Sequence, residues 1–167
     1  MTEQIQPMKI IINDKRWEWE DVEEGTRGDE LTLPVTAESV SNYAVDARNP
    51  NKRYLEAKDG DLAMPTGIFR DAQLRRFAVA QAAGFTALEL MEEDPRQTPF
   101  AKCTARWFAP IRVGDTLTNS PWVLEKYVRR GSKFVTFRVD IYNQNKVKVA
   151  EYDYTCIFEY AKGQNTG

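Results

Sequence analysis

Apolar and polar residues alternate with a period of two through most of the second half of the chain. The alternation begins over residues 101–107 and is most regular over residues 135–141 and 150–160. A period of two places successive side chains on opposite faces of a strand, so these segments predict strands with one buried face. Turn-forming residues at 130–132 and 143–146 predict hairpins between consecutive strands.

The expected strands are long. The strand predicted over residues 116–128 contains Pro121, which fits only at a bulge or at the edge of a sheet. Strands of about 12 residues span about 40 Å, and strands of that length must twist and coil. The sequence therefore predicts a long antiparallel sheet that curls around another element.

The segment that fits inside such a sheet runs from residue 64 to residue 84. Pro65 and Gly67 interrupt the loop before it, and Gly84 occupies the position of a left-handed C-terminal cap. Small side chains surround the segment, so we expect one helix over residues 68–83, closely enclosed by other elements. Its polar exceptions predict that at least one edge meets solvent or a partner: Arg70, Arg75, Arg76 and Gln81.

The first half of the chain predicts shorter elements. Residues 31–36 predict a short strand, and Thr36 is a suitable N-cap for a helix over residues 37–47. A polar loop without strong periodicity follows over residues 46–66, with a short helix at 53–58. Loops of this length are often functional, so this one is either a surface excursion or a flap over a pocket at the start of the long helix.

We expect a single domain over residues 1–167, with an N-terminal arm over residues 1–28 and a loose tail over residues 161–167. Trp17 and Trp19 lie in the arm, and we expect them to pack on the domain or on another subunit.

Composition narrows the function. Lys and Arg number 23 and Asp and Glu 25, for a net charge of −2, which argues against nucleic acid as the main partner. We expect no membrane span, no signal-peptide core and a cytoplasmic location. Cys103 and Cys156, the only cysteines, are predicted to be buried free thiols. The chain has no histidine, which excludes Ser-His-Asp triads, Cys-His dyads and histidine zinc sites, and we expect no metal.

Four segments resemble the MaoC-like hydratase/dehydratase branch of the hot-dog fold. The resemblance covers roughly residues 17–160, and the segments occur in the expected order around a helix of the expected kind. They are residues 43–50 (YAVDARNP), 64–67 (MPTG), 108–117 (FAPIRVGDTL) and 142–145 (YNQN). The resemblance implies an α+β hot-dog fold, with a five-stranded curved antiparallel sheet wrapped around a long central helix.

Members of that branch use an aspartate and a histidine to add water across the double bond of an enoyl thioester, or to remove it. Asn49 and Pro50 match the branch's motif residue by residue. The aspartate position holds Ala47 and the histidine position holds Lys52. Asp46, a weak substitute, stands where the branch has a glycine. No residue of this chain is therefore assigned a catalytic role with assurance.

The resemblance also implies a binding site. Asn49, Thr66, Gly67 and Ile68 fall at substrate-binding positions, and the backbone at Gly67 and Ile68 would polarise the thioester carbonyl near the N-terminus of the central helix. The implied ligand is an acyl-CoA or acyl carrier protein thioester, with no other cofactor. The implied partner is a second hot-dog chain, in a heterodimer or a homodimer.

Three functions remain open on these grounds. The first is a non-catalytic, acyl-thioester-binding subunit of an enoyl-CoA hydratase or 3-hydroxyacyl-thioester dehydratase, and another is a non-enzymatic thioester-binding homodimer. The remaining one is an active enzyme with a rearranged site built from Lys52 or from carboxylates: Asp46, Glu56, Asp59 and Asp61. A basic hairpin is either a solvated tip or a site for the phosphates of CoA: Lys126, Arg129, Arg130 and Lys133.

Overall fold

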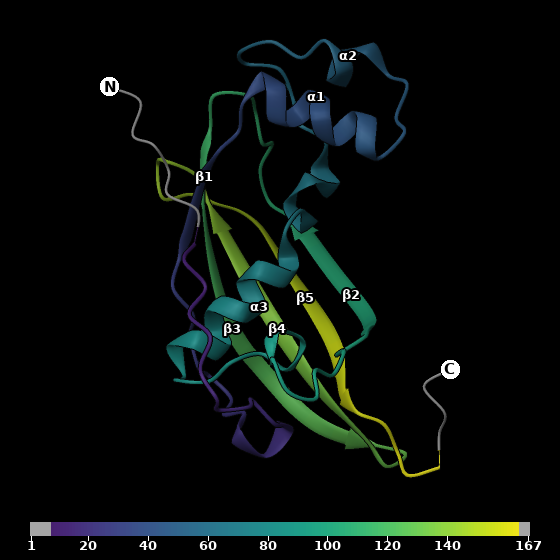
Figure 1. Ribbon diagram of the computed structural model, residues 1–167. Coiled ribbons are helices and arrows are strands. Elements are labelled where there is room, and N and C mark those ends of the chain that lie inside the picture. Colours follow the sequence, from purple (N-terminus) through teal and green to yellow (C-terminus); the bar gives the residue numbers. More distant parts are fainter. Residues whose placement is uncertain (1–7, 164–167) are drawn as a thin grey trace.

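A five-stranded antiparallel sheet dominates the computed structural model, which describes residues 8–163 (Figure 1). The strands lie in the order β1-β3-β4-β5-β2, and each pairs antiparallel with its neighbours. The expected curved sheet is confirmed. The outermost parts of the predicted arm and tail, residues 1–7 and 164–167, lie outside the described residues. The strands are β1 (Leu31–Pro34), β2 (Phe100–Trp107), β3 (Thr116–Arg129), β4 (Ser132–Tyr142) and β5 (Lys148–Glu159).

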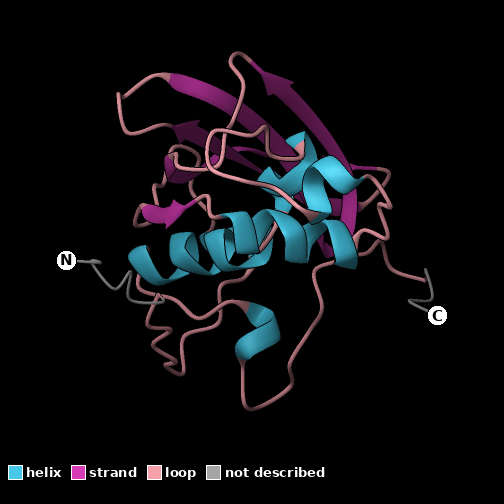
Figure 2. Cartoon of the chain, turned by 90° about the horizontal axis from the view of Figure 1, so that it is seen from above, coloured by secondary structure: helices cyan, strands magenta, loops and turns pink. Residues whose placement is uncertain are grey.

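The helices gather on one side of the curved sheet, as the view in Figure 2 shows. Thr36 caps the first of them, because its hydroxyl accepts from the Ser39 amide and the Ser39 hydroxyl accepts from the Thr36 amide, both at 3.0 Å. Within residues 8–163, no helix has the length and apolar character that crossing a bilayer requires. The helices are α1 (Ala37–Asp46), α2 (Lys52–Leu55) and α3 (Ala72–Ala82), with 3-10 turns η1 (Trp19–Asp21), η2 (Pro65–Phe69) and η3 (Leu88–Leu90).

The central helix is shorter than its sequence predicts. We expected one helix over residues 68–83, but η2 ends at Phe69 and α3 begins only at Ala72. Between them Asp71 adopts the left-handed conformation, with a φ of 58°, which ends regular helical hydrogen bonding. The helix-favouring residues on both sides gave no sign of this break. At the other end, Gly84 has a φ of 87° and terminates α3 as predicted.

The concave face of the sheet and α3 share one apolar core. Val135, Phe137, Val139 and Ile141 of β4 are completely buried, so the predicted inward face of this strand is confirmed. The inward face of β5 is buried in the same way over most of its length. On α3 the residues from Phe77 to Ala80 are buried against them.

The N-terminal arm packs on its own chain. Trp17 is 1% exposed, and its ring lies 5.9 Å from the rings of both Phe137 and Phe158. The indole N–H of Trp19 donates to the Phe134 carbonyl at 3.0 Å. Of the two expectations for these tryptophans, the structure shows packing on the domain.

The two cysteines differ in exposure. Both are free thiols, as predicted, but only Cys156 is buried, and burial raises the pKa of its thiol. Cys103 is exposed, so the expectation of two buried thiols was wrong for this residue. The reason is its place on β2, an edge strand that is exposed along almost its whole length.

The expected irregularities of the long strands also occur. Arg130 and Gly131 form the tip of the β3–β4 hairpin, and both have positive φ, as a type I′ turn requires. Pro121 lies beyond the four residues of β3 that pair with β1, and a register shift follows between Val123 and Glu125.

Gly28 provides a test of how tightly the arm is held. A β-carbon at this position would lie 2.7 Å from the Val79 nitrogen and 2.8 Å from the Ala78 carbonyl carbon, both in the backbone of α3. We expect Gly28→Ala to lower the free energy of unfolding by about 1–3 kcal/mol, because the backbone must shift to accept the methyl group. Urea denaturation followed by tryptophan fluorescence measures the change. Gly67→Ala is the control, because its nearest neighbour would be Tyr43 at 3.9 Å; equal midpoints for the two variants would contradict the close packing.

Candidate functional site

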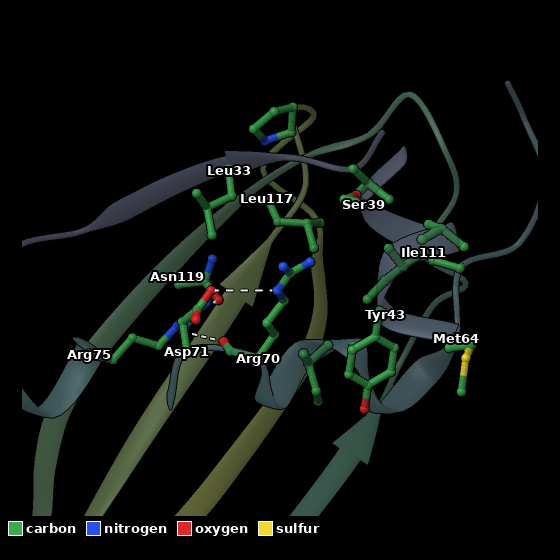
Figure 3. A pocket seen from close by; sticks show the side chains of 16 residues that line it. Leu33, Ser39, Tyr43, Met64, Arg70, Asp71, Arg75, Ile111, Leu117 and Asn119 are labelled. Atoms are coloured by element: carbon green, nitrogen blue, oxygen red, sulfur yellow. Dashed lines mark hydrogen bonds and ion pairs between the residues drawn. The ribbon is translucent and has the colours of Figure 1, made fainter. Parts of the chain in front are cut away.

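A cavity of about 240 Å³ lies between β1, α1, η2, the start of α3 and β3 (Figure 3). Its wall is largely apolar and includes the buried side chains of Val40, Ile68 and Ile111. Figure 3 shows its polar groups divided between two ends. Arg75, Asp71 and Asn119 gather at one end, whereas Tyr43 and Met64 lie at the other.

Residues predicted to bind substrate meet at the Tyr43 end. Gly67 and Ile68 line the cavity directly. The Tyr43 hydroxyl donates to the Thr66 carbonyl oxygen at 3.0 Å, and the Asn49 side-chain amide donates to the sulfur of Met64 at 3.6 Å. Thr66 and Asn49 therefore support the wall through Tyr43 and Met64, two lining residues that the sequence did not single out as binding residues.

The backbone expected to polarise a carbonyl is not at the N-terminus of the long helix. Because α3 begins at Ala72, Gly67 and Ile68 belong to the separate 3-10 turn η2. The Gly67 amide donates to the Met64 carbonyl at 3.0 Å, so a ligand oxygen would have to share this hydrogen. The helix-dipole contribution expected at Gly67 is thereby moved to Asp71 and Ala72.

The positions that the resemblance assigns to a catalytic pair lie outside the cavity. Ala47 is the C-cap residue of α1 and Lys52 is the first residue of α2, and both are exposed. Asp46 is also exposed and absent from the lining. The other proposed carboxylates share this placement: Glu56, Asp59 and Asp61. Their loop instead carries local turn bonds, such as that from the Lys58 amide to the Asp61 carboxylate at 2.8 Å.

The basic hairpin lies at the opposite end of the sheet from α1 and α2 (Figure 1). Lys133 pairs with Glu20 and with Glu159, and Lys126 lies 4.4 Å from the ring centroid of Trp19. Two of the four basic side chains, Lys126 and Lys133, thus make contacts within the chain. It does not bring this group, which also includes Arg129 and Arg130, to the cavity.

Arg76 is a buried cation paired with a carboxylate, although its Nε has no hydrogen-bond partner among the described residues. Arg76 is 6% exposed, so it does not belong to the edge that we expected to meet solvent or a partner. Its guanidinium donates to Glu89 at 2.7 Å and to the sulfur of Cys156 at 3.1 Å. The same Glu89 oxygen accepts from the Thr98 amide at 3.1 Å. This buried ion pair ties α3 to η3 and to the loop before β2.

Arg75 is buried without such a partner. It is 3% exposed, whereas Arg70 is exposed, so the expected solvent-facing edge includes Arg70 but not Arg75. Its Nε donates to the Asn119 side-chain oxygen at 3.2 Å, and its Nη1 donates to the Arg70 carbonyl at 2.7 Å. No carboxylate of residues 8–163 lies within 4.0 Å of it. Two adjacent arginines in a segment without a polar face were the sequence signal for buried charge.

Asp71 is the one carboxylate among the described residues that line the cavity. It stands at the break before α3, about half exposed, with a carboxylate oxygen 3.9 Å from the Arg70 Nε. Asp71 was not predicted as a site residue, because nothing in the sequence marks the break. Among the described residues, no group of three histidine, cysteine, aspartate or glutamate side chains is placed to hold a metal ion.

A curved antiparallel sheet of this strand order, closed around a central helix, is the hot-dog fold. Structural comparison agrees. A monoamine oxidase regulatory protein from Archaeoglobus fulgius matches with a TM-score of 0.68 at 17% identity, over 90% of this chain and 99% of its own. A chain of the C-terminally truncated HadBC (3R-hydroxyacyl-ACP dehydratase) complex from Mycobacterium tuberculosis matches at 0.61 and 14%, over 81% and 99%. A MaoC-like dehydratase from Rhodospirillum rubrum matches at 0.55 and 20%, over 84% and 96%.

The family described as FAS1-like, dehydratase domain region, matches residues 24–152, and the chain belongs to it. The expected place in the MaoC-like hydratase/dehydratase branch of the hot-dog fold is thereby confirmed. No functionally curated protein matches the chain significantly.

The buried ion pair of α3 can be tested by removing one charge. Glu89→Gln leaves Arg76 buried without its counter-ion, so we expect the free energy of unfolding to fall by about 3–5 kcal/mol. Chemical denaturation of the purified variant measures the loss. Glu92→Gln, an exposed glutamate three residues on, is the matched control and should change stability by less than about 0.5 kcal/mol. Similar losses in both variants would show that the pair is not the anchor of α3.

Proposed function

We propose that this chain is an acyl-thioester-binding, non-catalytic subunit of a MaoC-like enoyl-CoA hydratase or 3-hydroxyacyl-thioester dehydratase. One observation carries the proposal. The chain keeps a largely apolar cavity next to η2, while the positions corresponding to the family's acid–base pair are occupied by Ala47 and by the exposed Lys52. Without a general base at the reacting carbons, water addition loses a contribution of about 10²–10⁴ in rate.

The cavity suits a short acyl group. Its volume of about 240 Å³ is below the range of about 300–1,000 Å³ for drug-sized ligands. In our proposal the thioester lies near Gly67, next to Tyr43, and the acyl group extends between α1 and β3. The carrier is CoA or acyl carrier protein, and the four basic residues of the distant hairpin play no part in this arrangement.

The proposed partner is a second hot-dog chain that bears the catalytic pair. β2 is an edge strand, and its unpaired backbone groups are open to association. Beside it lies an apolar groove, lined by Phe69, Phe100, Cys103 and Tyr152 among others. The Tyr152 hydroxyl is buried and has no hydrogen-bond partner among the described residues, and burial raises its pKa to about 12. These features support a surface that another chain covers.

Binding without turnover is the first expected result. The purified chain should bind a short acyl-CoA in isothermal titration calorimetry and should not hydrate the matching enoyl-CoA. Val40→Phe, which fills the cavity from α1, is expected to weaken binding by about tenfold or more. Val45→Phe, on the exposed side of the same helix, is the matched control and should bind as the wild type does. Rapid hydration by the chain alone would overturn the non-catalytic assignment.

Alkylation of Cys103 tests whether a partner chain covers β2. Partial burial of the Cys103 sulfur and the Asp153 carboxylate raise the pKa of this thiol. The thiolate fraction grows as the pH rises toward that pKa, so alkylation is best followed at mildly alkaline pH. We expect one reactive thiol per native chain, Cys103, because Cys156 is buried.

Co-expression with a hot-dog chain that carries the Asp/His pair, encoded beside this one, should give an active complex in which Cys103 is protected. Native mass spectrometry distinguishes this complex from a homodimer. Unchanged labelling of Cys103 in a stable complex would exclude β2 from the interface.

A second candidate function follows from Asp71. Its carboxylate lines the cavity on a residue with left-handed backbone, and strained conformations of this kind cluster at functional sites. If the chain alone hydrates an enoyl-CoA, Asp71→Asn should reduce the rate by about 10²–10⁴, whereas Asp46→Asn should leave it unchanged.

A further inference from the structure

The end of the cavity opposite Tyr43 contains a buried guanidinium without a counter-ion. We propose that Arg75, held in place by Asn119, binds a carboxylate there, so that the preferred ligand is a short acyl group with a carboxylate at its far end. The acyl part of this inference rests on the proposed function, whereas the carboxylate site does not.

The two arginines of α3 form an internal comparison. Arg76 and Arg75 are adjacent in sequence and nearly equally buried, but only Arg76 contacts a carboxylate. Taking a cation out of water is costly unless an opposite charge and hydrogen bonds replace the lost solvation. The partners of Arg75 are two uncharged oxygens, those of Asn119 and Arg70. An anion from outside the chain would give Arg75 the counter-ion that Glu89 gives Arg76.

The geometry leaves the guanidinium available to a ligand. A guanidinium has five N–H donors, and the described contacts of Arg75 use Nε and Nη1, whereas Nη2 donates to no described group. The Asn119 amide nitrogen donates to the Leu31 carbonyl at 3.2 Å, which turns its oxygen toward Arg75. Asn119 is therefore a positioning residue, and Arg75 is the residue that would contact the carboxylate in a charge-assisted pair.

Charges at the rim do not cancel this attraction. Asp71 would repel a carboxylate, but its oxygen lies 3.9 Å from the Arg70 Nε, so these two charges offset each other. Two arginines and one aspartate leave the lining with one net positive charge at this end (Figure 3). Figure 3 shows Leu33 and Leu117 above Asn119 and the Arg70 guanidinium, and the apolar part of the lining suits a hydrocarbon chain that joins two polar groups.

A structural role for Arg75 is the competing explanation. Its bond to the Arg70 carbonyl satisfies an acceptor at the break between η2 and α3, and this bond alone would justify retaining the residue. Such a role does not discriminate between charged and neutral ligands. Ligand preference, measured as a ratio, therefore separates the two explanations even where a variant is less stable.

The experiment compares two CoA thioesters of equal acyl length, pentanoyl-CoA and the monothioester of glutaric acid, by calorimetry with the full chain. We expect the glutaryl thioester to bind about tenfold or more tightly. Arg75→Met should remove the preference. Asn119→Asp should also remove it, because the new carboxylate has nearly the shape of the asparagine side chain and pairs with the Arg75 guanidinium itself. Arg76→Met is the matched control: it weakens the fold but should keep the ratio.

Free hexanoate and hexanol, followed by ligand-observed NMR, test the carboxylate site without a thioester. If hexanoate binds in an Arg75-dependent way and neither thioester does, the carboxylate site stands and the proposed function fails. If both thioesters bind equally and Arg75→Met leaves the ratio unchanged, the proposed function stands and the carboxylate site is overturned. If none of the four probes binds, both are overturned.

Discussion

Charged side chains on a helix enclosed by a curved sheet need partners within the protein, because water no longer reaches them. This constraint organises the whole structure. On α3, six consecutive residues from Arg75 to Ala80 are buried, and two of them are arginines. Glu89 neutralises the charge of Arg76 in a buried ion pair, which also holds the segment before β2 in place. Arg75 donates hydrogen bonds only to uncharged oxygens, and it lines the cavity.

The break before α3 creates the site. If the helix continued without interruption from η2, its first turn would occupy the corner where Ile68, Arg70 and Asp71 now surround the cavity. The left-handed Asp71 separates the two segments, so that η2 can follow the Tyr43 end of the cavity while α3 follows the sheet. The polar loop between α1 and η2 then lies over the outside, with its charges in solvent. The cavity and the two positions that the resemblance assigns to a catalytic pair, Ala47 and Lys52, thus lie in different parts of the chain.

The sequence predicted those features that depend on short-range pattern. Strict alternation from Val135 to Ile141 identified β4, and Thr36 as an N-cap identified the start of α1, because both signals are local. The exposure of Cys103 could not be predicted from the sequence, because the alternation of apolar and polar residues does not indicate which strand lies at the edge of the sheet. The burial of Arg75 depends on contacts with residues more than 40 positions away, such as Asn119. Of the residues that line the cavity, Gly67 and Ile68 in η2 were predicted from a motif, whereas Asp71 and Arg75 at the charged end were not predicted as site residues.

The attachment of the arm bears on the order in which the chain assembles. Trp17 donates its amide to the Thr86 carbonyl, and residues 25–28 exchange backbone hydrogen bonds with Pro121 and Val123, almost 100 residues later. The arm can contact Thr86 and α3 before β3 is synthesised, but Phe137 and Phe158, which pack on the Trp17 ring, follow only with β4 and β5. Closure of such long loops is slow, because their entropy is lost before the contacts form. A nascent chain of this kind exposes the bare concave sheet and the indole of Trp17 together, which makes the interval before arm docking the period of greatest exposure to aggregation.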